Sequence, residues 1–148
     1  MPPVRSIGGI FLCPIAAIRA GGLAEPVHCA EMGSYRNLAV WQRAHALTIA
    51  VYRLTRAFPK YELYGVTAQM RRAASSICAN LAEGCGRNGD RELLRFVRIA
   101  LGSANELEYH ILLAGELEYL DGSACGQLQA EVTVVLRMLA KLANRLSR

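Results

Sequence analysis

The 148-residue sequence has little of what an enzyme or a metalloprotein needs. It contains no phosphate-binding glycine loop and no nucleophile elbow. None of its five cysteines form a CxxC pair, and its three histidines are scattered. A di-metal centre in a helical bundle would need Glu-x-x-His pairs on its helices, yet Glu106 and His110 are four residues apart. The sequence therefore predicts a protein that is not an enzyme and has no cofactor or metal site.

Long hydrophobic runs are also missing. The apolar stretch over residues 7–18 is interrupted by Pro14 and by two glycines, and it is too short to span a bilayer. Residues 1–31 differ in pattern from the rest and form a non-conforming extension. We expect them to be a leader, or the product of a start codon placed too early, with a signal peptide or an ordered arm as alternatives. The odd number of cysteines argues against a secreted disulfide framework, so we predict a cytoplasmic protein with no membrane partner.

Lysine is scarce, and the basic residues are almost all arginine. Of 17 Lys and Arg residues only Lys60 and Lys141 are lysine, and the formal net charge is +5. The guanidinium group suits planar, bidentate recognition of carboxylate or phosphate. This composition favours two kinds of partner, namely nucleic acid and oppositely charged surfaces of other subunits.

Four segments have helical periodicity, and none alternates as a strand does. Apolar residues recur at spacings of three and four over residues 40–58, 66–84, 93–114 and 128–146. Pro59 ends the first segment, glycines end the second, and Asp90 is the expected N-cap of the third. The short connections predict that residues 32–148 form one all-α domain, an antiparallel up-down-up-down four-helix bundle.

The second helical segment carries small residues along one side and polar residues at core-like positions. Reflecting the chain about its turns places residues 73–76 opposite residues 101–104, so the second and third helices should approach closely. The same reflection places Asn80 and Glu83 within reach of Arg36 and Arg43. Asn80 is expected to be a buried hydrogen-bonding position that fixes register. Glu83 also stands one turn before Arg87, the spacing of an ordinary helix ion pair.

The predicted topology separates the charges along the bundle. Ten basic residues gather at one end against Glu83, Asp90 and Glu92, which gives that end a net charge of +7. These ten are Arg36, Arg43, Arg87, Arg91, Arg95, Arg98, Arg137, Lys141, Arg145 and Arg148. The other end carries −2, and Glu106 falls opposite Arg137. Such an end can bind phosphate backbones, or it can form salt bridges between subunits.

Five aromatic residues cluster on the first helix and at its ends. They are Tyr35, Trp41, Tyr52, Tyr61 and Tyr64. Packing between helices explains them most simply, and a subunit interface is the functional alternative. Nucleobase stacking is a third alternative, which the separation of these rings from the arginines in sequence disfavours.

Several motifs resemble one bacterial family over residues 34–146. The matching segments are 35–44 (YRNLAVWQRA), 51–55 (VYRLT), 58–62 (FPKYE), 69–73 (QMRRA), 76–84 (SICANLAEG) and 100–108 (ALGSANELE). Together they resemble the four helix bundle proteins, also called 23S rRNA intervening-sequence or S23-type proteins. Two positions depart from the family pattern: Cys78 stands where proline is usual, which puts a helix kink in doubt, and Cys85 stands where an aromatic residue is common.

The resemblance implies an antiparallel four-helix bundle that assembles as a homopentamer and has no established enzymatic activity. A related branch, the accessory variability determinant of diversity-generating retroelements, uses a basic pentamer to bind a reverse transcriptase and nucleic acid. The expected partners are therefore a second copy of this chain, RNA or DNA, and a reverse transcriptase or another nucleoprotein.

Together, these observations predict RNA or nucleoprotein binding through the Arg-rich end, and the alternative is a protein-interaction scaffold with no nucleic-acid role. The candidate nucleic-acid-binding residues are Arg43, Arg87, Arg91, Arg95, Arg98, Arg137, Lys141 and Arg145. The candidate structural motif consists of Asn80, Glu83, Gly84 and Gly102.

Overall fold

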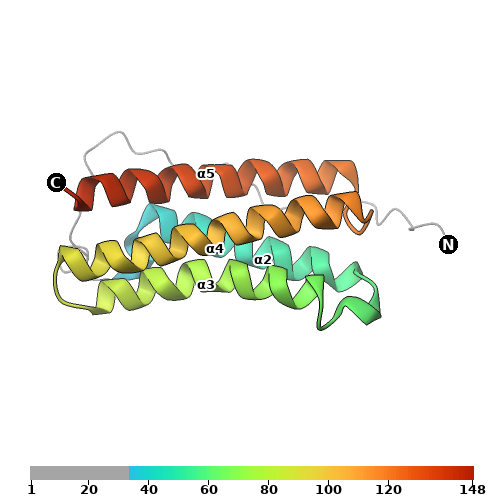
Figure 1. Ribbon diagram of the computed structural model, residues 1–148, viewed down its shortest axis with the longest axis horizontal. Helices are drawn as coiled ribbons and strands as arrows, with labels where there is room; N and C mark the ends of the chain where they lie inside the picture. Colours follow the sequence, from blue (N-terminus) through green and yellow to red (C-terminus); the bar gives the residue numbers. More distant parts are fainter. Residues whose placement is uncertain (1–33) are drawn as a thin grey trace.

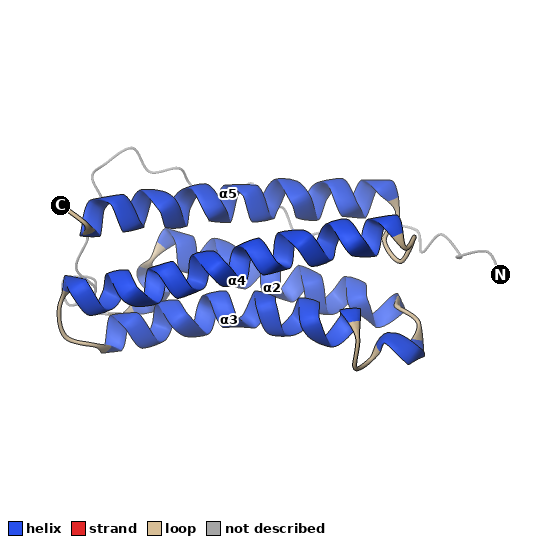
Figure 2. Ribbon diagram, in the orientation of Figure 1, coloured by secondary structure: helices blue, strands red, loops and turns tan. Residues whose placement is uncertain are grey.

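The computed structural model describes residues 34–148, so the expectations for residues 1–31 lie outside the described residues. Four long helices run antiparallel to one another (Figure 1). They are α2 (Ala39–Leu54), α3 (Val66–Gly86), α4 (Asp90–Glu116) and α5 (Gly122–Leu146). The described residues contain no strand (Figure 2). The predicted all-α, up-down-up-down four-helix bundle is therefore confirmed.

Each helix packs against two neighbours. Helix α3 lies between α2 and α4, and α5 closes the bundle by contacting both α4 and α2. Because the helices alternate in direction, the first residues of α2 and α4 lie at the same end as the last residues of α3 and α5 (Figure 1). One end of the bundle is thus built from residues far apart in the sequence.

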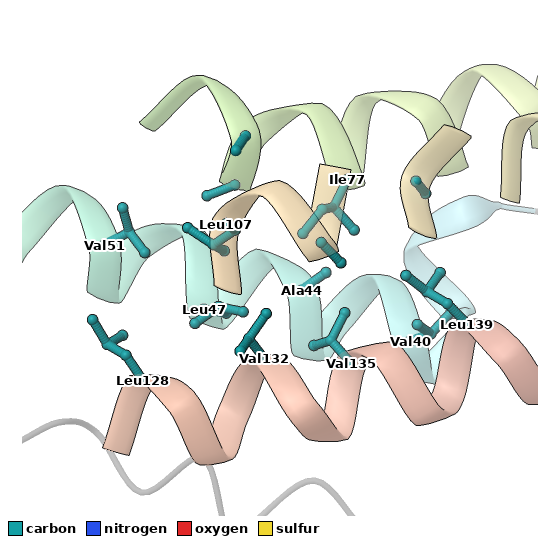
Figure 3. Close-up of a cluster of buried hydrophobic side chains, with 14 of the residues drawn as sticks. Val40, Ala44, Leu47, Val51, Ile77, Leu107, Leu128, Val132, Val135 and Leu139 are labelled. Carbon is teal, nitrogen blue, oxygen red and sulfur yellow. The ribbon is translucent and has the colours of Figure 1, made fainter. Parts of the chain in front are cut away.

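The core follows the predicted spacing of three and four. Val40, Ala44, Leu47 and Val51 of α2 face Leu128, Val132, Val135 and Leu139 of α5, with Ile77 and Leu107 entering from α3 and α4 (Figure 3). All ten are at most 5% exposed. Burial of this apolar stripe on every helix drives the assembly of the four helices.

The helix ends differ from the sequence prediction in two places. Helix α2 ends at Leu54 and continues as the 3-10 turn η3 (Thr55–Ala57) before Pro59, whereas one α-helix was expected up to Phe58. Asp90 is the first residue of α4 rather than its N-cap. The residue before it, Gly89, has φ +91°, a conformation that suits glycine and reverses the chain there.

The last two helices are joined by a short turn that hydrogen bonds hold in place. Glu118 has φ +60°, and the Tyr119 N–H donates to the Ala114 carbonyl at 2.9 Å, which closes the end of α4. Asp121 then caps α5, because its side-chain oxygen accepts from the Ala124 N–H at 2.8 Å. This turn fixes α5 antiparallel to α4.

Helices α3 and α4 approach each other closely, as the small residues predicted. A Cβ added to Gly84 would lie 2.7 Å from the Phe96 Cβ and 3.1 Å from the Leu93 Cδ1. Further along the same contact, the Ser76 and Ser103 hydroxyls are 2.9 Å apart. The expectation that Gly102 joins this contact is wrong, because Gly102 is exposed and nothing lies within 4 Å of the position of its Cβ.

The kink that was in doubt at Cys78 is absent, since α3 runs unbroken from Val66 to Gly86. The Cys78 thiol lies 3.7 Å from the Thr48 hydroxyl of α2. Burial raises the pKa of this thiol, although the hydrogen bond with Thr48 opposes that shift. Cys78 therefore behaves as a packing residue and not as a nucleophile.

The contrast between the two glycines gives a stability prediction. Gly84→Ala should lower the free energy of unfolding by about 1–3 kcal/mol, because the added methyl group overpacks the contact with Phe96. Gly102→Ala should raise it by about 0.5–1 kcal/mol, since the methyl group meets open space and alanine favours a helix. Chemical denaturation of both variants measures the difference, and equal effects would show that the α3–α4 spacing is not set at Gly84.

Candidate nucleic-acid interface

The topology brings three basic segments to one end of the bundle. The first half of α4, the last part of α5 and the end of α3 meet there (Figure 1). We define the Arg-rich end as the basic residues Arg36, Arg87, Arg91, Arg95, Arg98, Arg137, Lys141, Arg145 and Arg148. These nine cations are opposed by Glu83, Asp90 and Glu92, which leaves a net charge of +6.

The outer faces of α4 and α5 supply the cations with the fewest internal partners. Arg91, Arg98, Arg137 and Lys141 are exposed, and none of them forms an ion pair with a described residue. The expected pairing of Arg137 with Glu106 is not formed, since Glu106 instead lies 3.7 Å from His110. Unpaired, solvated cations can release bound counter-ions when a polyanion binds.

The end of α5 also presents a groove between its basic side chains. The groove is lined by Arg137, Ala140, Lys141, Asn144, Arg145 and Arg148. Four of these six residues are cations, and none is acidic. The Asn144 amide can both donate and accept hydrogen bonds. This lining can bind phosphate oxygens through charge-assisted hydrogen bonds.

Arg43 was a candidate for this surface, but it lies inside the bundle wall. Its guanidinium group binds Glu131 of α5 through two hydrogen bonds, Nε to Oε2 at 2.8 Å and Nη2 to Oε1 at 3.1 Å. The two side chains are only 18% and 21% exposed. The pair therefore connects α2 to α5, and Arg43 is a structural residue whose charge is compensated.

Arg87 and Arg95 both lie near the ring of Phe96. Their guanidinium carbons are 5.9 Å and 5.8 Å from the centre of its ring. Arg87 also donates to Glu83 at 2.8 Å, while Arg95 lies 3.8 Å from Glu92. The expectation that Glu83 pairs with Arg36 or Arg43 is thus wrong, because Glu83 pairs with Arg87, one turn further along the chain. Both arginines keep an exposed side chain, so they remain part of the surface.

The polar residues of α3 form a local network. The Asn80 amide donates to the Ser76 carbonyl at 2.8 Å and to the Ser76 hydroxyl at 3.0 Å, and that hydroxyl contacts Ser103 of α4. Asn80 therefore acts on the α3–α4 contact rather than on α2. Of the proposed structural motif, Asn80 and Gly84 serve this contact, Glu83 serves the surface pair with Arg87, and Gly102 faces solvent.

Aromatic rings separate into two groups in space. Near the Arg-rich end, Trp41 stacks on His45 at 4.9 Å and meets the edge of Tyr35 at 5.1 Å. At the opposite end, Tyr61 and Tyr64 are 76% and 90% exposed. The sequence placed both groups near the first helix but did not predict that Trp41 stacks on His45. Their spacing of four residues on one helix was the only signal for this contact.

Residues 34–148 contain neither of two other kinds of site. No three His, Cys, Asp or Glu side chains in this part of the chain are grouped so that they could hold a metal ion. No helix there has both the length and the apolar character needed to cross a membrane.

The fold and this surface define a class: a small antiparallel four-helix bundle with one strongly basic end. The sequence model of the 23S rRNA-intervening sequence protein family matches residues 36–141. The chain belongs to this family.

One solved structure has the same fold. It is a crystal structure of a protein of unknown function from the S23 ribosomal protein family of Bacteroides thetaiotaomicron, with a TM-score of 0.66 and 21% sequence identity. The similarity covers 71% of this chain and 95% of that one. No protein with a curated description matches the sequence.

Two ion pairs of equal length give a second prediction. In double-mutant cycles, the coupling between Arg43 and Glu131 should be about 1–3 kcal/mol, because both groups are mostly buried and bonded twice. The coupling between Arg87 and Glu83 should be much smaller, since water screens both groups. Equal couplings, measured by chemical denaturation, would contradict the structural role assigned to Arg43.

Proposed function

We propose that the protein is a non-enzymatic, cytoplasmic, homopentameric bundle that binds RNA, or a nucleoprotein that contains it, through the Arg-rich end. The observation that carries the proposal is the group of unpaired, exposed cations on the outer faces of α4 and α5. Phosphate contacts of this kind supply most of the affinity of sequence-independent binding and make it strongly dependent on salt.

The electrostatics of the bundle support this proposal. The Arg-rich end carries +6, while the residues of the opposite turns, 55–65 and 115–125, include four acidic and two basic side chains, a net charge of −2. A molecule polarised in this way orients an approaching polyanion towards one end before contact. The Arg43–Glu131 pair adds no free charge, so the binding surface is confined to α3, α4, α5 and the segment before α2.

The pentamer is supported by apolar side chains that the single bundle leaves exposed. Ile49 and Tyr52 on α2, and Ile99 and Leu112 on α4, are 38–47% exposed. Helices α2 and α4 lie at diagonal corners of the bundle, so these side chains lie on opposite flanks. Two different flanks that meet in a head-to-tail manner can close a ring.

A pair of matched charge reversals tests the binding surface. Arg91→Glu combined with Arg98→Glu should weaken binding to structured RNA at least about tenfold and make the log–log salt slope shallower by about 2, since two phosphate contacts are lost. The control is Arg53→Glu with Arg56→Glu, which changes the charge equally at exposed positions on and just beyond the end of α2. Fluorescence anisotropy over a salt series measures both.

Three results would distinguish the alternatives. Equal losses in the two variants would mean that net charge, not the Arg-rich end, governs binding. Wild-type protein without affinity for RNA or duplex DNA at low salt would favour the scaffold function. If the Arg91 and Arg98 changes instead disrupt the oligomer, measured by light scattering on the same samples, those cations serve subunit contacts.

A further inference from the structure

The end of the bundle opposite the arginines presents a cluster of large apolar side chains to solvent. Tyr61, Leu63 and Tyr64 follow α2, and Leu117 follows α4. Their exposed fractions are 76%, 50%, 90% and 43%. We refer to these four residues as the tip. Large apolar side chains that are exposed at one end of a protein mark interaction surfaces, and tyrosine is among the residues that contribute most to binding.

Hydrogen bonds and ring packing beneath the tip form a scaffold that holds its loop in place. Its central residue is Glu62, whose Oε1 accepts from the Tyr119 hydroxyl at 3.0 Å and whose Oε2 accepts from the Val66 N–H at 3.0 Å. The Tyr119 ring packs on Phe58 at 5.5 Å. A side chain at Gly65 would meet the Glu62 carboxylate, so glycine makes room for these bonds. A surface ordered in advance loses little conformational entropy when it binds a partner.

The Tyr119 hydroxyl belongs to the same scaffold. The neighbouring Tyr61 hydroxyl, with smaller effects from burial and from Glu62, raises the pKa of Tyr119 above its ordinary value. The hydrogen bond from Tyr119 to Glu62 connects the loop after α2 with the turn after α4. The two loops act as one surface.

Acidic side chains lie at the same end of the bundle as the tip. Glu116, Glu118 and Asp121 are exposed at the turn between α4 and α5, and the loop after α2 contributes the exposed cation Lys60. An acidic rim disfavours both nucleic acid and anionic lipid as occupants. It favours a partner that offers cations together with flat surfaces that tyrosine rings can contact.

The Arg-rich end of a second copy has this chemistry. It carries +6 against the −2 of the tip end, and its guanidinium groups can stack on tyrosine rings as well as pair with carboxylates. The chain already places arginines over rings: the Arg36 guanidinium lies 5.1 Å from the centre of the Tyr35 ring, and Arg71 lies 5.0 Å from that of Tyr52. The two surfaces lie at opposite ends of one bundle (Figure 1), so they cannot meet within a single copy.

We propose that the tip of one copy docks on the Arg-rich end of another, which stacks assembly units end to end. The contact is heterologous, because it joins two different surfaces along the long axis of the bundle. Contacts of this type extend into open stacks unless rotation closes them. The stacking is distinct from ring formation, which uses the flanks of α2 and α4.

Sedimentation velocity of the full chain over protein concentration tests the stacking. At about 0.05 M salt we expect multiples of the basic unit, and at about 1 M salt, where the Debye length falls to about 3 Å, we expect the unit alone. Tyr61→Ser with Tyr64→Ser should weaken stacking at least about tenfold. The matched control, Tyr61→Phe with Tyr64→Phe, should keep most of it because the rings remain.

Mixing two defective variants separates this contact from general aggregation. The tip variant (Tyr61→Ser with Tyr64→Ser) and an end variant (Arg91→Glu with Arg95→Glu) should each sediment as single units. Their mixture should give two-unit complexes that cannot grow, since each unit keeps only one of the two kinds of surface intact. Wild-type protein that stays a single unit at low salt, or a mixture that does not associate, would overturn the proposal.

Discussion

The close approach of α3 to α4 at Gly84 determines how the rest of the molecule is arranged. Phe96 can lie against the α3 backbone only because residue 84 has no side chain. This contact sets the register of the two helices, which the Ser76–Ser103 hydrogen bond and Asn80 then maintain. With that register fixed, Arg87 of the α3 end and Arg95 of α4 both lie near the ring of Phe96. The short turn from α4 to α5 brings the cations of α5 to the same end.

Closure of the bundle separates structural charge from free charge. The charge of Arg43 is compensated by Glu131, and this partly buried ion pair connects the first and last helices. On α4 and α5, by contrast, four exposed cations form no ion pair with a described residue: Arg91, Arg98, Arg137 and Lys141. The protein therefore keeps a basic surface whose removal need not unfold it, and the same surface can accept either phosphates or the acidic, tyrosine-rich tip of another copy. Those two occupants would compete.

The sequence predicted the helices and the meeting of residues 73–76 with residues 101–104, because short turns leave consecutive helices little freedom. It did not predict the Arg43–Glu131 pair, because helices α2 and α5 are not consecutive and meet only when the bundle closes. Reflecting the chain about one turn pairs only the two helices that the turn joins. Gly102 was misplaced by one position, since one residue rotates a helix by about 100° and turns a side chain away from its neighbour. Tyr61 and Tyr64 were noticed, but the hydrogen bond from Tyr119 to Glu62, which holds their loop against the turn after α4, joins residues far apart in the sequence and was missed.

The proposed function depends on where RNA contacts the chain. Photocrosslinking of structured RNA to the full protein, with the linked peptides identified by mass spectrometry, locates that contact directly. We expect crosslinks within residues 87–98 and 137–148. Crosslinks concentrated instead in residues 49–64 or 106–121, where the tip and the acidic turn lie, would contradict it.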